Sequence, residues 1–230
     1  MRSAGIHPKL ILTQNPNCKA KITTNIEEFL RVSPSRNLVG VTGTKGKGTT
    51  STLISSMLTA AGNKVHLVGN IGQPPLEIID AVQPDDWVVL ELSSFQLEDF
   101  KGPSPHIAMC LMMVPEHLNW HASMDEYTAA KSNLFRFQTE EDYAIYYGEN
   151  DTSAQVASVS LGKQLPYCKS PGAFVNSDHI EIEEVQLLRL KKLSCMANIT
   201  GKTPVQQLLP SGRSLLMLMQ FKKYYGLLAA

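Results

Sequence analysis

Short apolar runs separated by polar, glycine-containing segments organise the first two thirds of this chain. Each run is typical of a buried strand, and together they cover residues 38–41, 65–68, 87–92, 107–114 and 143–147. Segments that favour helices lie between them, at residues 51–61, 75–82 and 124–137. Fully apolar strands that alternate with helices predict an α/β fold: a mostly parallel sheet of the P-loop type, flanked by helices on both faces.

The alternation weakens after the fifth run. Residues 148–151 are expected to form a turn, and short edge strands are expected at 174–175 and 179–182. Residues 191–230 contain Lys-Thr-Pro, Leu-Pro-Ser-Gly and a Met/Leu-rich run without the earlier pattern. This part is therefore expected to be an irregular C-terminal tail.

Composition and charge narrow the class of protein. The chain has 230 residues, 43% of them hydrophobic, and 21 basic residues balance 21 acidic ones. A net charge near zero favours neither nucleic acid nor a membrane as partner. The four cysteines (Cys18, Cys110, Cys168 and Cys195) are scattered, and no apolar run is long enough to span a membrane. These features predict a cytoplasmic protein.

A glycine-rich segment follows the first apolar run and carries the candidate chemistry. Its residues are Gly43, Thr44, Lys45, Gly46, Lys47, Gly48, Thr49 and Thr50. Glycines let backbone N–H groups turn towards a phosphate, the following helix adds the positive end of its dipole, and Lys47 adds a mobile cation. A hydroxyl of Thr49 or Thr50 suits Mg²⁺. The segment therefore predicts an ATP-binding loop.

The match to the common P-loop pattern is imperfect. That pattern would place glycine where Val41 stands and Ser or Thr where Gly48 stands. The alternative is a glycine-rich turn that only joins a strand to a helix. Alternating glycines around two lysines, with hydroxyls at the helix start, favour phosphate binding.

Four ordered motifs resemble those of the Mur ligases. They are TGTKGKGTT, GNIGQP at residues 69–74, LELSSFQLE at 90–98 and PEHLNWHASMDEYTAAK at 115–131. The segments SAGIHPKL and ITTNIEEFL, nearer the start, are similar to the end of that family's N-terminal domain. The resemblance is strongest to the branch that adds D-glutamate, because GNIG occurs together with SSFQL.

This resemblance implies an activity, cofactors and partners. The family joins an acid to an amine with ATP and Mg²⁺ in the synthesis of peptidoglycan precursors. A carboxylate of UDP-N-acetylmuramoyl-L-alanine attacks the γ-phosphate to give an acyl phosphate, and the amine of D-glutamate then displaces phosphate. Such chemistry depends on positioning and on charge neutralisation.

The resemblance also implies site residues. Lys47 would contact the β- and γ-phosphates, and Thr49 or Thr50 together with Glu91 would hold one Mg²⁺. His117 corresponds to the histidine at a second Mg²⁺, and Lys131 to a lysine that is carbamylated to bridge the metals. Lys47, His117 and Lys131 are thus the predicted catalytic residues. Without the family, Glu91 could equally be a structural hydrogen-bond acceptor and Lys131 a solvated lysine.

Further positions follow from the same motifs. Asn70 and Ser93 match polar residues that face the UDP-sugar substrate, although either could instead satisfy turn backbone. His121 is expected to cap a helix or to lie on the surface. The chain departs from the usual family pattern at four positions: Lys45, Gly48, Met112 and Glu116. Because of Gly48, Thr49 is the better candidate metal ligand.

The predicted division of the chain has three parts. Residues 1–36 would be a remnant of the UDP-binding domain with its linker, 37–190 the central ATP-binding domain, and 191–230 a tail foreign to the family. A slip of reading frame near residue 190 is one hypothesis for the tail, since synonymous codons for 196–208 can encode the missing His-Asn-x-x-Asn motif in another frame. The coding DNA would test it.

Two alternatives to an incomplete D-glutamate ligase remain open. Lys47-Gly48 is similar to the loop of folylpolyglutamate synthase, which belongs to the same superfamily. The second alternative is a fragment without catalytic activity, which either only binds a nucleotide or associates with separately encoded domains.

Overall fold

The computed structural model describes residues 8–17, 19, 23–170, 172–176, 179–182 and 185–189. Its helices are α1 (Pro8–Gln14), α2 (Asn25–Val32), α3 (Lys47–Ala60), the 3₁₀ helix η1 (Pro75–Ala81), α4 (Ser94–Leu97), α5 (Met124–Ser132) and α6 (Asp151–Ala157). Its strands are β1 (Leu38–Thr42), β2 (Val65–Gly69), β3 (Trp87–Glu91), β4 (Ile107–Cys110), β5 (Tyr143–Tyr147), β6 (Lys163–Tyr167), β7 (Phe174–Asn176), β8 (His179–Ile182) and β9 (Val185–Arg189). No helix in this described part is long and apolar enough to cross a bilayer.

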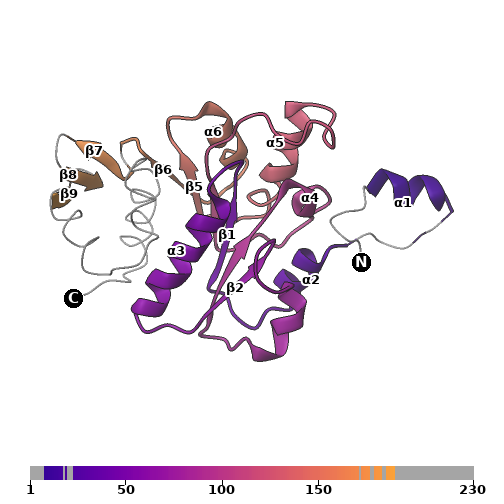
Figure 1. Cartoon of the computed structure of the whole chain (residues 1–230), viewed down its shortest axis with the longest axis horizontal. Helices are drawn as coiled ribbons and strands as arrows, with labels where there is room; N and C mark the ends of the chain where they lie inside the picture. Colours follow the sequence, from indigo (N-terminus) through magenta and orange to yellow (C-terminus); the bar gives the residue numbers. More distant parts are fainter. Residues whose placement is uncertain are drawn as a thin grey trace.

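The main sheet is parallel throughout and has the strand order β2-β3-β1-β4-β5-β6. Figure 1 shows it at the centre of the molecule, with helices beside it. The central strand β1 pairs with β3 and β4, so that Val41 lies opposite Glu91 and Thr42 opposite Cys110. The carboxyl ends of these three strands therefore meet at one edge, as the predicted α/β fold requires. The strands β7, β8 and β9 form a separate antiparallel sheet.

Alternate residues of the central strands enter two different cores. Val39 and Val41 of β1 pack with Ile54 and Leu58 of α3 on one face. Leu38 lies in the other core, which also contains residues of α2, α4, α5 and α6. All of these apolar side chains are buried. Burial of both strand faces explains why the strands read as continuous apolar runs.

The helix α2 packs on the same core as the sheet. Its side chains Ile26, Phe29 and Leu30 are buried against that core. The Thr24 hydroxyl caps the helix by accepting a hydrogen bond from the backbone N–H of Glu27 at 3.2 Å. The division after residue 36 stays a prediction, but α2 itself is held by the central sheet.

Several element bounds differ from the sequence prediction. The helix α3 begins at Lys47, earlier than residue 51, because Gly46 adopts a left-handed conformation (φ 88°) that starts the helix. The strand β4 ends at Cys110 rather than at residue 114, and α5 ends at Ser132 rather than at 137. Beyond β4, the backbone of Val114 donates to the Thr44 hydroxyl instead of to a neighbouring strand.

The sequence analysis did not predict the helix α6 or the strand β6, which forms one edge of the main sheet. Residues 148–151 were expected to form only a turn, but the Asn150 side chain accepts a hydrogen bond from the backbone N–H of Ser153 and thereby caps α6. The strand β6 was not predicted because its first two residues are exposed and Pro166 interrupts its apolar pattern. The expected strands at 174–175 and 179–182 are confirmed as β7 and β8. The predicted tail lies outside the described residues.

Candidate functional site

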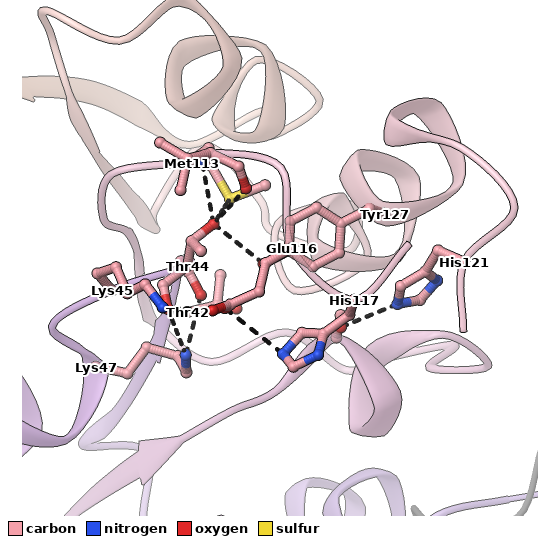
Figure 2. A network of polar contacts seen from close by, with 12 residues as sticks. Thr42, Thr44, Lys45, Lys47, Met113, Glu116, His117, His121 and Tyr127 are labelled. Carbon is pink, nitrogen blue, oxygen red and sulfur yellow. Dashed lines mark hydrogen bonds and ion pairs between the residues drawn. The ribbon is translucent and has the colours of Figure 1, made fainter. Parts of the chain in front are cut away.

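The glycine-rich segment is a tight loop at the carboxyl end of β1. Gly43 has a φ of 133°, and a Cβ atom there would lie 2.7 Å from the Cβ of Leu111. Glycine is therefore required, both for conformation and for space. Gly46 precedes the first turn of α3, whose backbone N–H groups have no partner within the helix. Lys47 folds back over the loop and donates to the carbonyl oxygens of Gly43 and Thr44, at 3.2 and 3.1 Å (Figure 2).

Thr44 ties this loop to the segment that follows β4. Its buried hydroxyl lies 3.0 Å from the carbonyl oxygen of Val114 and 3.1 Å from the hydroxyl of Tyr127, and it accepts a hydrogen bond from the backbone N–H of Val114 at 3.0 Å. When the Thr44 hydroxyl donates to the Val114 carbonyl, the Tyr127 hydroxyl can donate to Thr44. The backbone N–H of Thr44 donates to the carbonyl of Met112 at 2.9 Å. Tyr127, which the sequence analysis did not single out, thus supports the loop. Its signal was only that it precedes Lys131 by one helical turn.

Lys131 is buried beside the loop, with a relative exposure of 1%. Its ammonium donates to the Gly43 carbonyl at 2.8 Å and to the Thr42 hydroxyl at 3.2 Å, and it lies 4.8 Å from the ring centre of Tyr127. Burial, followed by the nearby charge of Lys47, lowers the pKa of Lys131 to about 7. The alternative of a solvated surface lysine is wrong.

Glu91 ends β3 next to the loop. Its side chain is only 2% exposed, and its Oε2 atom has no hydrogen-bond partner within the described structure. A buried carboxylate oxygen without a donor is costly unless a cation joins it. The orphaned oxygen therefore fits a divalent cation better than it fits a purely structural acceptor.

The loop after β4 brings His117 and Glu116 to the same edge. His117 has a φ of 58°, and its ring lies edge-on to Phe95 with 4.8 Å between centres. Glu116 contacts the ammonium of Lys45, and its other oxygen lies 3.6 Å from the His117 Nε2 atom. The hydrogen bond from Lys45 is the main reason that the pKa of Glu116 is lowered.

The expectation that His121 caps a helix or lies on the surface is wrong. It is 1% exposed, and its Nε2 atom lies 3.0 Å from the hydroxyl of Ser94. Burial lowers the pKa of His121. The ring also stacks on Phe95, at 6.0 Å between centres. His121 therefore joins α4 to the His117 loop from inside the protein.

The remaining predicted residues are more loosely placed. Thr49 is exposed in the first turn of α3, whereas Thr50 is buried. Asn70 is exposed, and its backbone N–H donates to the Glu91 carbonyl at 2.8 Å. Ser93 donates through both its backbone N–H and its hydroxyl to the Gln96 side chain. Phosphate, metal and substrate contacts of these residues stay predictions.

The metal prediction rests on a mixed set of ligands. Among the residues described, no three side chains of His, Cys, Asp or Glu gather so that they could hold a metal ion. The predicted set of Thr49, Glu91, His117 and Lys131 contains only two of these types. As a metal site it therefore depends on a hydroxyl and on a chemically altered Lys131.

The chain is similar in sequence to a known protein family and to named members of it. A family model, the Mur ligase middle domain, matches residues 41–206. UDP-N-acetylmuramoylalanine--D-glutamate ligase of Natranaerobius thermophilus is 39% identical over 161 residues, which are 68% of this chain and 35% of that protein. The ligase of the same name from Acetivibrio thermocellus is 42% identical over 162 residues, 69% of this chain and 34% of that protein. The chain thus spans about a third of the length of these relatives.

A solved structure shares the fold. MurF from Acinetobacter baumannii superposes with a TM-score of 0.57 at 15% identity, over 79% of this chain and 46% of that one. At this identity the likeness concerns the fold alone. It agrees with the parallel sheet and its flanking helices.

Proposed function

The chain belongs to the Mur ligase family, and on that premise we propose that it is the central, nucleotide-binding part of an ATP-dependent ligase that adds D-glutamate to UDP-N-acetylmuramoyl-L-alanine. The observation that carries the proposal is the identity of 39% and 42% to proteins named as D-glutamate ligases. The phosphate loop, with Lys47 folded over it, supports an ATP site. The product would be a precursor of peptidoglycan.

The phosphate loop has one task in this proposal. The N–H groups at the start of α3 and the ammonium of Lys47 bind the phosphates and neutralise the charge that develops when the substrate carboxylate attacks the γ-phosphate. Lys47 now donates to the carbonyls of Gly43 and Thr44. These are weak enough contacts to be exchanged for phosphate oxygens, which carry full charge.

Mg²⁺ would be held by Glu91, His117 and Thr49. When bound, it would neutralise phosphate charge and orient the substrate carboxylate. The partnerless Oε2 of Glu91 supports this assignment most directly. Thr49 is preferred to Thr50 because its side chain is exposed at the start of α3.

Lys131 would contribute after modification. A pKa of about 7 leaves a large neutral fraction of its amine near neutral pH. The neutral nitrogen can form a bond to the carbon of CO₂ while one C=O π bond opens on to its oxygen, and the nitrogen then loses a proton to solvent. A neutral amine thereby becomes a carbamate anion. That anion, beside Glu91, would complete the cation site.

Partner domains are part of the proposal. The chain spans 35% of its Natranaerobius relative, so binding of the UDP-sugar by Asn70 and Ser93 and binding of D-glutamate would need the first and third domains of the family. The division at residues 36 and 190 is proposed from the sequence pattern alone, and the match to the family model extends past residue 190, to residue 206. The domains could be supplied by separate chains.

Two measurements test the proposal. Mg-ATP should raise the melting temperature of the purified chain, and Lys47→Ala should abolish that rise. If neither holds, the loop is vestigial. With the missing domains supplied, the chain should restore ligation of D-glutamate but not of L-glutamate; the opposite preference would favour a folylpolyglutamate synthase, the candidate suggested by Gly48.

A further inference from the structure

Two oppositely charged side chains link the phosphate loop to the loop that carries His117. Lys45 lies in the phosphate loop and contacts the Oε1 atom of Glu116, a residue 71 positions later in the chain. Figure 2 shows Glu116 between Lys45 and His117, with a dashed line to each. The Lys45 side chain is 64% exposed and that of Glu116 is 28% exposed. The pair therefore spans the solvent side of the proposed phosphate site.

The position of the Glu116 carboxylate conflicts with phosphate binding. It is negatively charged, it holds one cation of the loop, and it also lies within the electrostatic influence of Lys47. A polyphosphate brings more negative charge to the same cations, so that a carboxylate that stays in place would repel it. Either Glu116 moves when nucleotide binds, or it weakens binding throughout.

The pair can be opened at small cost. Exposed ion pairs contribute only about 0.2–1 kcal/mol, and a polyphosphate offers the Lys45 ammonium several negative charges where the Glu116 carboxylate offers one. The long, solvated Lys45 side chain can turn from one partner to the other. The free energy of exchange therefore favours phosphate over carboxylate.

We propose that the Lys45–Glu116 ion pair is a latch that the nucleotide phosphates open, after which Lys45 binds phosphate and the Glu116 carboxylate is released beside His117. Lys45 is then a second phosphate-binding cation next to Lys47. The proposal rests on the proposed ATP site but not on the ligase reaction. It links filling of the phosphate site to the charge around His117.

The latch makes distinctive predictions for three single variants and one double variant. Glu116→Gln removes the competitor and should tighten ATP about threefold to tenfold, since Lys45 is then free. Lys45→Gln should weaken ATP by a similar factor, and Lys45→Arg should restore it. The double variant, Lys45→Gln with Glu116→Gln, should differ from Lys45→Gln alone by less than twofold in ATP affinity, because without Lys45 there is no ion pair to open. AMP should show much smaller effects than ATP, since it has fewer phosphates to reach Lys45.

Calorimetric titration of ATP and AMP at low salt, with and without Mg²⁺, measures these affinities. Lys64→Gln is a matched control. Lys64 is 59% exposed and pairs with Asp86 at the amino ends of β2 and β3, whereas the phosphate loop lies at the carboxyl edge of the sheet. It should leave ATP affinity unchanged. Melting curves establish that each variant is folded.

Each contrary outcome overturns a different statement. If Glu116→Gln tightens ATP equally with and without Lys45, the carboxylate only repels phosphate and there is no latch. If Lys45→Gln binds ATP like the unmodified chain, Lys45 is not a phosphate ligand and the proposal is wrong. If neither the unmodified chain nor Glu116→Gln binds ATP, the phosphate site and the latch are both overturned. Binding of ATP without ligation of D-glutamate would instead contradict only the proposed reaction.

Discussion

The Nζ atom of Lys131 lies 2.8 Å from the carbonyl oxygen of Gly43, so that a buried lysine of α5 is bonded to the first residue of the phosphate loop. Two lysines thus donate to carbonyl oxygens of the loop: the buried Lys131, and Lys47 at the start of α3. Their mutual repulsion adds to burial in lowering the pKa of Lys131. This arrangement has consequences for stability as well as for the proposed chemistry.

Lys131 should make the stability of the protein depend on pH. Its pKa is about 7 in the folded chain and about 10.4 for an unfolded lysine. Between these values the unfolded state binds more protons, so that this residue makes the free energy of unfolding rise with pH, by at most about 1.4 kcal/mol per unit. Urea unfolding of the unmodified chain and of Lys131→Met, at pH 7, 8 and 9 in carbonate-free buffer, measures the difference. Parallel pH curves for the two proteins would contradict the burial argument.

Glu91→Gln should separate stability from metal binding. The substitution keeps the shape of the side chain and removes a buried charge whose Oε2 atom has no partner. Without Mg²⁺ the variant should be as stable as the unmodified chain or more stable by about 1 kcal/mol. The melting temperature of the unmodified chain should be higher with Mg-ATP than with ATP alone, and this difference should disappear in Glu91→Gln. Glu77→Gln removes an exposed carboxylate of η1 as the control; an equal loss there would show a general charge effect.

Gly48→Ser should strengthen the Mg²⁺-dependent part of nucleotide binding. A Cβ atom at Gly48 would meet no atom within 4 Å, so that a serine fits without strain. The residue lies in the first turn of α3, where its hydroxyl can reach a metal on the phosphates. Gly48→Ala is the control, since it also replaces the glycine by a residue of higher helix propensity, by about 0.5–1 kcal/mol for alanine, but adds no hydroxyl. Equal Mg-ATP affinities for the two variants would argue against a metal at this position.

Gly69→Ala should be far more damaging than Gly62→Ala. Both glycines have positive φ values, 115° and 87°. A Cβ at Gly69 would lie 2.3 Å from the Glu91 carbonyl oxygen, whereas a Cβ at Gly62 would meet nothing within 4 Å. We expect the free energy of unfolding to fall by about 1 kcal/mol in Gly62→Ala. In Gly69→Ala it should fall by more than about 3 kcal/mol, because β2 and β3 must separate to admit the Cβ atom. Chemical unfolding measures both, and similar losses would show that backbone strain alone decides.

Local sequence determined the core of the fold and the phosphate loop. Continuous apolar runs predicted the strands β1 to β5, because strands covered on both faces need apolar residues at every position. The glycines of the loop were identifiable because a tight turn from strand to helix excludes side chains, as the close approach of Gly43 to Leu111 illustrates. The weak points were elements with short or interrupted patterns, namely α6 and β6.

Only the tertiary structure decided the environment of the charged side chains. Lys131 in a polar helix and His121 in a polar loop read as surface residues, yet both are buried. The Lys45–Glu116 pair joins residues 71 positions apart, and the Lys131–Gly43 bond joins residues 88 apart. The order of parallel strands brings these residues together, and hydrophobic periodicity carries no information about strand order. Local pattern thus determined which elements form and where the phosphate loop lies, whereas burial and charge at the site followed from packing between distant segments.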